Sequence, residues 1–145
     1  MNAGLAPMIR EYHSADEAAV IALWSACDLI RPQNDPCKDI ARKLRVNPEW
    51  FLVAESTDSE IVGSVMAGYE GHRGWINYLA VAPAHRRGGY GRALMAAAEQ
   101  RLRAAGCPKI NLQVRPENPG VIAFYERLGF RVEGAVSLGR RLEID

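Results

Sequence analysis

The first third of the chain has the apolar spacing of helices, preceded by a short extended run at 8–12. Four apolar residues follow the i, i+3, i+4, i+7 spacing of one helix face: Val20, Leu23, Trp24 and Cys27. Ser14 and Glu17 precede them in the S-x-x-E pattern, which predicts a capping box at the start of this helix.

A second helix and a group of strands follow. Asp35 before Pro36 has the pattern of an N-cap and a proline at the first helical position, which predicts a helix through about Val46. Three strands joined by short polar turns come next, at 50–55, 61–69 and 75–81. Short turns between consecutive strands predict an antiparallel meander.

The remaining residues alternate between helix and strand. We expect a helix from about Gly89 to Ala105, stopped by Gly106, and another from Asn118 to Gly129. Strands are predicted at 110–114, 130–134 and 136–144. The order β-α-α-β-β-β-α-β-α-β-β predicts an α/β (α+β) fold, with a mixed, mostly antiparallel sheet of about seven strands flanked by about four helices.

Composition adds few constraints. The length of 145 residues predicts one domain over 1–145, with an ordered core at about 8–144. A net charge of +1 gives no support for a general role on nucleic acid or on a membrane surface, and no apolar stretch is long enough to span a bilayer.

Cysteines and histidines are few and scattered. The three cysteines, Cys27, Cys37 and Cys107, form no Cys-x-x-Cys pair, which is typical of free thiols in a reducing compartment. The three histidines lack the spacing of metal ligands, so we expect no metal site. Residues 1–8 do not have the pattern of a signal peptide, and we expect a cytoplasmic protein.

The segment between the strand at 75–81 and the next helix is rich in glycine and arginine. Its glycines allow a tight turn, the first amides of a helix are unpaired donors, and Arg86, Arg87 and Arg92 add positive charge. These features predict a site for a diphosphate or a similar anion. The alternative is a basic surface loop.

Two familiar phosphate-binding motifs do not fit this segment. A P-loop requires a lysine after its last glycine, and no such lysine is present. A dinucleotide-binding turn requires a third glycine where Leu94 stands and an acidic residue near the position of Asn111.

The same segment resembles a known family. Arg86-x-x-Gly89-x-Gly91 after Leu79-Ala80-Val81-Ala82-Pro83 resembles the acetyl-CoA signature of the GNAT N-acetyltransferases. Asn118-x-x-Val121-Ile122-x-Phe124-Tyr125-Glu126-x-Leu128-Gly129-Phe130 is similar to the second signature of that superfamily. The element order also matches over 8–144, and the segments 27–36 and 68–74 resemble the small bacterial YpeA-like acetyltransferases.

The resemblance implies a fold, a co-substrate and a reaction. The chain is expected to bind acetyl-CoA without a metal and to transfer the acetyl group to an amine by direct attack in a ternary complex. The residues implied to bind acetyl-CoA are Leu79, Ala80, Val81, Arg86, Arg87, Gly88, Gly89, Tyr90, Gly91, Arg92, Asn118 and Tyr125. Gly88 replaces the Arg or Lys frequent in the family, at little expected cost because the cradle is made of backbone.

Two residues are implied to be catalytic. The backbone amide of Leu79 would polarise the thioester carbonyl, while the Leu79 side chain belongs to the core. Tyr125 would protonate the departing thiolate, since a phenol of pKa about 10 and a thiol of pKa about 8.5 are nearly matched. Packing with a satisfied hydroxyl is the alternative for Tyr125, and a helix cap is a second role for Asn118.

The general base and the acceptor stay open. The strand at 75–81 lacks the acidic residue found in many relatives, and Glu70, His72 or a water chain are the candidates for the base. Polar residues of the loop between the first two helices and of the last hairpin are candidates for the acceptor pocket: Arg31, Gln33, Asn34, Asp35, Ser137, Arg140 and Arg141, with Trp75 and Tyr78 as an aromatic wall. Alternatives are a CoA-binding module without turnover and transfer of a larger acyl group. A homodimer through the last strand is an expectation from the family.

Overall fold

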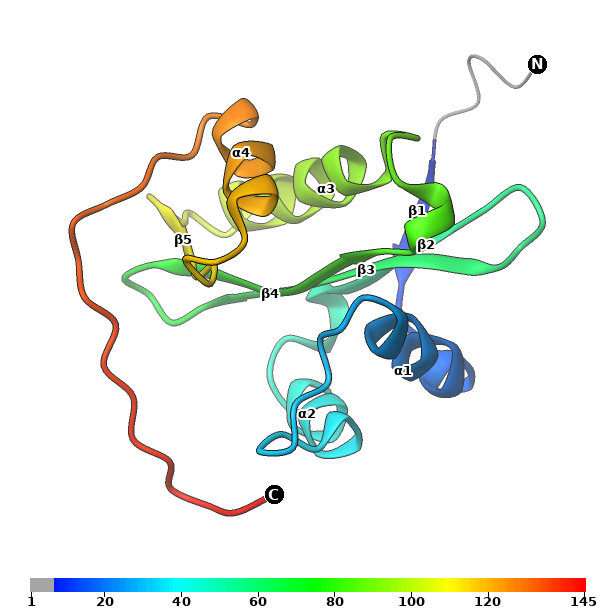
Figure 1. Cartoon of the computed structure of the whole chain (residues 1–145), viewed down its shortest axis with the longest axis horizontal. Coiled ribbons are helices and arrows are strands. Elements are labelled where there is room, and N and C mark those ends of the chain that lie inside the picture. The colour runs from blue at the N-terminus through cyan, green and yellow to red at the C-terminus, as the bar shows by residue number, and fades with distance from the viewer. Residues whose placement is uncertain (1–6) are drawn as a thin grey trace.

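A computed structural model describes residues 7–145 and places a five-stranded sheet between two layers of helices (Figure 1). Residues 1–6, which contain most of the segment examined for a signal peptide, lie outside the described residues. The strands are β1 (Met8–Glu11), β2 (Phe51–Glu55), β3 (Ile61–Tyr69), β4 (Gly74–Val81) and β5 (Ile110–Leu112). Neighbouring strands from β1 to β4 are antiparallel and β5 is parallel to β4, which confirms the predicted meander and the mixed sheet.

Helices α1 (Glu17–Ala26) and α2 (Pro36–Lys43) cover one face of the sheet. The predicted helix face is confirmed, because Val20, Leu23 and Trp24 are buried against this face together with Ile40 of α2. The predicted N-cap is also confirmed, since Asp35 Oδ1 accepts hydrogen bonds from the Cys37 and Lys38 amides at 2.8 and 3.4 Å.

Helices α3 (Tyr90–Ala104) and α4 (Pro119–Arg127) cover the opposite face. Leu94, Met95, Ala98 and Leu102 of α3 form one core with β2, β3 and β4. Gly106 follows the C-cap residue Ala105 of α3 and has φ of 85°, as its predicted role in ending the helix requires. No helix within residues 7–145 is long and apolar enough to cross a membrane.

The predicted capping box at Ser14 and Glu17 is wrong. Residues Ser14–Asp16 form a short 3-10 helix, and Asp16 caps it by accepting a hydrogen bond from the His13 amide at 2.8 Å. The cause is Arg10, whose guanidinium binds the Asp16 carboxylate at 2.8 Å and fixes it at this turn.

The two closing strands predicted at 130–134 and 136–144 do not form, so the described sheet has five strands instead of seven. The chain after α4 runs past β5 and ends near α2 (Figure 1). Side-chain contacts hold it there: Lys109–Glu133 at 2.7 Å, Gln113–Ser137 at 2.5 Å, Asn34–Arg141 at 2.6 Å and Arg42–Asp145 at 2.7 Å. Its alternating apolar residues therefore have no sheet to face, and pairing of a last strand across a dimer stays a prediction.

Candidate active site

A β-bulge interrupts β4 near its carboxyl end. The register with β3 pairs Ser64 with Ala80 but Met66 with Asn77, so β4 carries one extra residue here. Tyr78 lies in this bulge with φ of 52°, a left-handed conformation that is a true outlier for a bulky side chain. Leu79 is the residue directly after it.

Beyond the bulge, no strand within residues 7–145 pairs with the second edge of β4. β5 pairs only with Gly74, Trp75 and Ile76 and then ends. The Ala82 amide donates to the Val62 carbonyl, so the alternation of an antiparallel ladder turns the Val81 N–H away from β3. The Val81 carbonyl accepts from the Cys27 thiol and from Arg86 Nε at 3.3 and 3.2 Å, which leaves its amide as the free group.

The glycine- and arginine-rich segment forms a tight turn into α3. Arg87 and Gly89 both have positive φ, of 72° and 84°. The first backbone bond of α3 runs from the Ala93 amide to the Gly89 carbonyl, and no side chain of residues 7–145 caps the amides before it. The helix therefore begins with free donors next to three arginines, as an anion site requires.

Gly91 brings the candidate elements together. A Cβ at this position would lie 3.1 Å from the Phe124 ring and 3.7 Å from a Val81 methyl group. The start of α3, the end of β4 and helix α4 thus meet at one point, and the tight approach to the Phe124 ring favours a glycine. The arrangement fits a ligand that extends from the α3 amides along the unpaired edge of β4.

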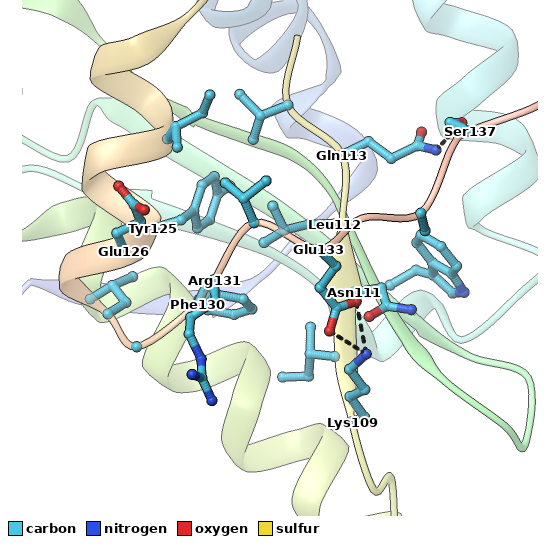
Figure 2. Close-up of a pocket in the computed structure, with 18 of the residues that line it drawn as sticks. Lys109, Asn111, Leu112, Gln113, Tyr125, Glu126, Phe130, Arg131, Glu133 and Ser137 are labelled. Carbon is cyan, nitrogen blue, oxygen red and sulfur yellow. Dashed lines mark hydrogen bonds and ion pairs between the residues drawn. The ribbon is translucent and has the colours of Figure 1, made fainter. Parts of the chain in front are cut away.

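Tyr125 lies on α4, buried to 8% exposure, with its ring edge-to-face against Phe124 and Phe130. Figure 2 shows the Tyr125 side chain at a cavity of about 1240 Å³ between α4, β5 and residues 130–137. Burial raises the pKa of Tyr125 to about 12, so the phenol holds its proton at neutral pH. A thiolate leaving in the same apolar surroundings would also have a raised pKa, which brings the two groups closer to balance.

Asn118 stands at the N-cap position of α4, but the predicted side-chain cap is absent within the described chain. Its ψ of 68° differs from the extended value of a capping residue. Asn118 is an exposed residue at the start of α4.

The candidates for the general base lie at the wrong end of β4. Glu70 and His72 belong to the β3–β4 turn, and roughly 16 Å of extended strand separates Gly74 from Leu79. Glu70 also accepts hydrogen bonds from the His72 and Arg73 amides, which lowers the pKa of its carboxyl. The structure does not bring these two residues to the bulge.

The acceptor candidates form two groups. Asn34 and Arg141 are in contact through the 2.6 Å hydrogen bond, so the loop before α2 and the C-terminal segment do meet. Trp75 instead lies beside the cavity of Figure 2, and Ser137 binds Gln113 at its rim. Tyr78 faces α1 and α2, because its ring stacks on Trp24 with centroids 3.8 Å apart.

Tyr78 is contacted by three residues that were not predicted as part of the site from the sequence: Trp24, Asp39 and Ser64. Ser64 was the accessible signal, since it is a polar residue in the apolar run of β3. Among residues 7–145 no cluster of three or more His, Cys, Asp or Glu side chains has the arrangement of a metal site.

Comparison with known proteins identifies the family. The model of the acetyltransferase (GNAT) family matches residues 9–130. The chain belongs to the GNAT family. An acetyltransferase of Pectobacterium atrosepticum is 52% identical over 134 residues, which cover 92% of this chain and 94% of that protein. The GNAT assignment makes the chain an acyltransferase of a family that uses acetyl-CoA.

Solved structures support the same GNAT fold. Ard1 from Thermoplasma volcanium has a TM-score of 0.75 at 25% identity, covering 90% of this chain and 86% of its own. AAC(6')-Iy, solved with the bisubstrate analog CoA-S-monomethyl-acetylneamine, has a TM-score of 0.77 at 19% identity, covering 94% and 99%. At that identity the likeness concerns the fold alone.

Proposed function

We propose that the chain transfers the acetyl group of acetyl-CoA to a primary amine by direct attack in a ternary complex. The observation that carries the proposal is the bulged, unpaired end of β4 next to the free amides of α3. The free amides of α3 suit the diphosphate of a CoA thioester, and the unpaired edge of β4 suits its amide-containing arm.

The diphosphate would lie on the amides of residues 87–92. These amides are backbone donors at a helix N-terminus, where the helix dipole favours an anion. Arg86, Arg87 and Arg92 supply compensating positive charge. The pantetheine arm would pair with the free edge of β4 and with Asn118.

Two groups would act on the thioester. The Leu79 amide would donate to the carbonyl oxygen as negative charge develops on it. Tyr125 would give its proton to the sulfur as the carbon–sulfur bond breaks. Cys107 is no candidate for an acyl-enzyme, because its thiol donates to the Lys109 carbonyl in the turn after α3, at the opposite end of a 15-residue helix.

The amine would approach from the face covered by α1 and α2. Arg31 of the loop between α1 and α2, and Arg141, which contacts Asn34 of that loop, suit an acceptor that carries a carboxylate, such as an amino acid or a peptide end. The free thiols of Cys27, Cys37 and Cys107 suit a reducing compartment, and we propose that the reaction takes place in the cytoplasm.

Gly91→Val tests the acetyl-CoA site. A side chain here collides with Phe124 and displaces the start of α3, so we expect the acetyl-CoA dissociation constant to rise at least about tenfold by titration calorimetry. Gly68→Val is the matched control, because a Cβ at Gly68 meets nothing within 4 Å. Unchanged affinity in the folded Gly91 variant would contradict the site.

Thiol release from acetyl-CoA with a panel of primary amines tests turnover. Release with at least one amine is expected. Tight acetyl-CoA binding without release for any amine would instead favour a binding module, a candidate suggested by the missing acidic residue on β4.

A further inference from the structure

We propose that Ser64, Trp24 and Asp39 form a clamp on Tyr78 that fixes the β4 bulge and thereby aims the Leu79 amide at the thioester carbonyl. The inference rests on the function proposed above. The three clamp residues act through Tyr78 and are therefore positioning residues.

Tyr78 needs such a clamp because its backbone conformation is unfavourable. A φ of 52° suits glycine, whereas an aromatic residue there persists only when its surroundings hold it. The bulge places Tyr78 and Leu79 together between the pairs Asn77–Met66 and Ala80–Ser64. If Tyr78 relaxes, the next peptide unit turns and the direction of the Leu79 N–H changes.

Ser64 and Trp24 contact the carbonyl and the ring of Tyr78. The Ser64 hydroxyl donates to the Tyr78 carbonyl at 2.8 Å and accepts from Trp24 Nε1 at 2.9 Å, so its donor and one acceptor site are used. Both Ser64 and Trp24 have 0% exposure, which makes these bonds costly to break. The Trp24 ring also stacks on the Tyr78 ring at an angle of 13°.

Asp39 of α2 contacts the Tyr78 hydroxyl. The hydroxyl donates to Asp39 Oδ2 at 2.6 Å. Arg42 fixes the same carboxylate by a contact of 3.3 Å to Oδ1 and binds Asp145 at 2.7 Å. Burial and the Asp39 charge raise the pKa of Tyr78, so the hydroxyl keeps the proton that it donates.

These contacts separate the clamp from the proposed diphosphate site at the start of α3. The clamp lies on the α1 and α2 face, whereas the free amides of α3 lie on the opposite face. Loss of a clamp contact should therefore lower kcat with little effect on acetyl-CoA affinity. A loss of overall stability alone would not lower kcat while leaving acetyl-CoA affinity nearly unchanged.

The test uses Asp39→Ala, Tyr78→Phe, their double variant and Asp39→Asn, whose amide oxygen still accepts from the Tyr78 hydroxyl. We expect Asp39→Ala and Tyr78→Phe each to lower kcat about tenfold, part of the effect of losing an oxyanion donor, while the acetyl-CoA dissociation constant changes less than about twofold. The double variant should be no slower than the slower single variant, because both substitutions remove the same hydrogen bond between Tyr78 and Asp39. Asp39→Asn should keep most of the activity.

The control is Tyr69→Phe, which removes a tyrosine hydroxyl bonded to the Gly71 carbonyl in the distant β3–β4 turn. Additive losses in the double variant, unchanged kcat in both single variants, or an Asp39→Asn variant as slow as Asp39→Ala would overturn the proposal. The last result would indicate that the Asp39 charge matters instead of its hydrogen bond.

Amide hydrogen exchange gives a readout that does not depend on turnover. We expect faster exchange at 78–80 in Asp39→Ala, where the Tyr78 hydroxyl loses its acceptor, and wild-type exchange in Asp39→Asn, which keeps an acceptor although its ion pair with Arg42 is lost. Unchanged exchange in Asp39→Ala would overturn the clamp. If no amine releases thiol from the wild-type protein, the proposed function fails, and the exchange result still decides whether the clamp holds the bulge.

Discussion

Single residues in this site do work that their residue types do not indicate. Tyr78 occupies a backbone conformation suited to glycine, and Ser64 is a fully buried hydroxyl on an apolar strand. Tyr125 matches a known signature, so its position was predictable, but its pKa depends on burial that only the fold provides. The chemistry of the site therefore depends on how the fold places these individual residues.

Tyr125→Phe should lower kcat without changing acetyl-CoA affinity, and it should also alter the dependence of stability on pH. The folded-state pKa of about 12 lies above the ordinary value of 10, so this tyrosine contributes stability that is complete below pH 10 and is lost as pH rises toward 12. The change amounts to about 3 kcal/mol at most.

Urea unfolding at pH 9 and pH 11.5 measures this effect. The free energy of unfolding should fall less between the two pH values in Tyr125→Phe than in the wild-type protein. The wild-type fall will not vanish in the variant, since the pKa values of Tyr12 and Tyr78 are also raised. Equal falls in both proteins would show that Tyr125 ionises normally.

At the scale of elements, local signals were sufficient where the chain itself supplies the partner. The Asp35–Pro36 start of α2, the Gly106 stop after α3 and the meander of β2 to β4 were all predictable. The Ser14–Glu17 pair failed because a residue from β1, Arg10, determines the local geometry. The bulge in β4 has no local signal, since no sequence period reveals an extra residue in a strand.

Asp35→Ala should destabilise the protein by about 1 kcal/mol, because two amides of α2 lose their acceptor. The measurement is the free energy of unfolding in urea. Asp35→Asn is the matched variant, since its side-chain oxygen can still accept, and we expect it to lose only a fraction of this amount. Equal losses would show that the Asp35 charge, and not the cap, stabilises α2.

At the scale of the whole molecule, the C-terminal segment is what the sequence could not place. Its alternating apolar residues are typical of a strand, yet the fold holds the segment by polar contacts outside the sheet. Two of those contacts, Asn34–Arg141 and Arg42–Asp145, join residues 107 and 103 positions apart, and no local pattern contains that information.

Asp145→Ala should release this segment. The Arg42 guanidinium and the Asp35 amide both bind the Asp145 carboxylate, and these contacts hold its pKa below the ordinary range, so the attachment is complete at neutral pH. Trypsin should then cut after Arg140 and Arg141 faster than in the wild-type protein, as followed by mass spectrometry. Glu143→Ala is the control, because its contact with Arg42 is 3.7 Å and exposed. Equal cleavage rates in both variants would contradict the anchor.

The exposed apolar residues of this segment have an energetic consequence. Leu138, Leu142 and Ile144 are 92%, 89% and 93% exposed, and covering each such side chain is worth about 2 kcal/mol. Most Leu and Ile side chains elsewhere in the described chain are buried or partly buried. Within residues 7–145, the C-terminal segment thus carries the most exposed large apolar side chains, so a surface that covered this segment would gain hydrophobic free energy from all three residues.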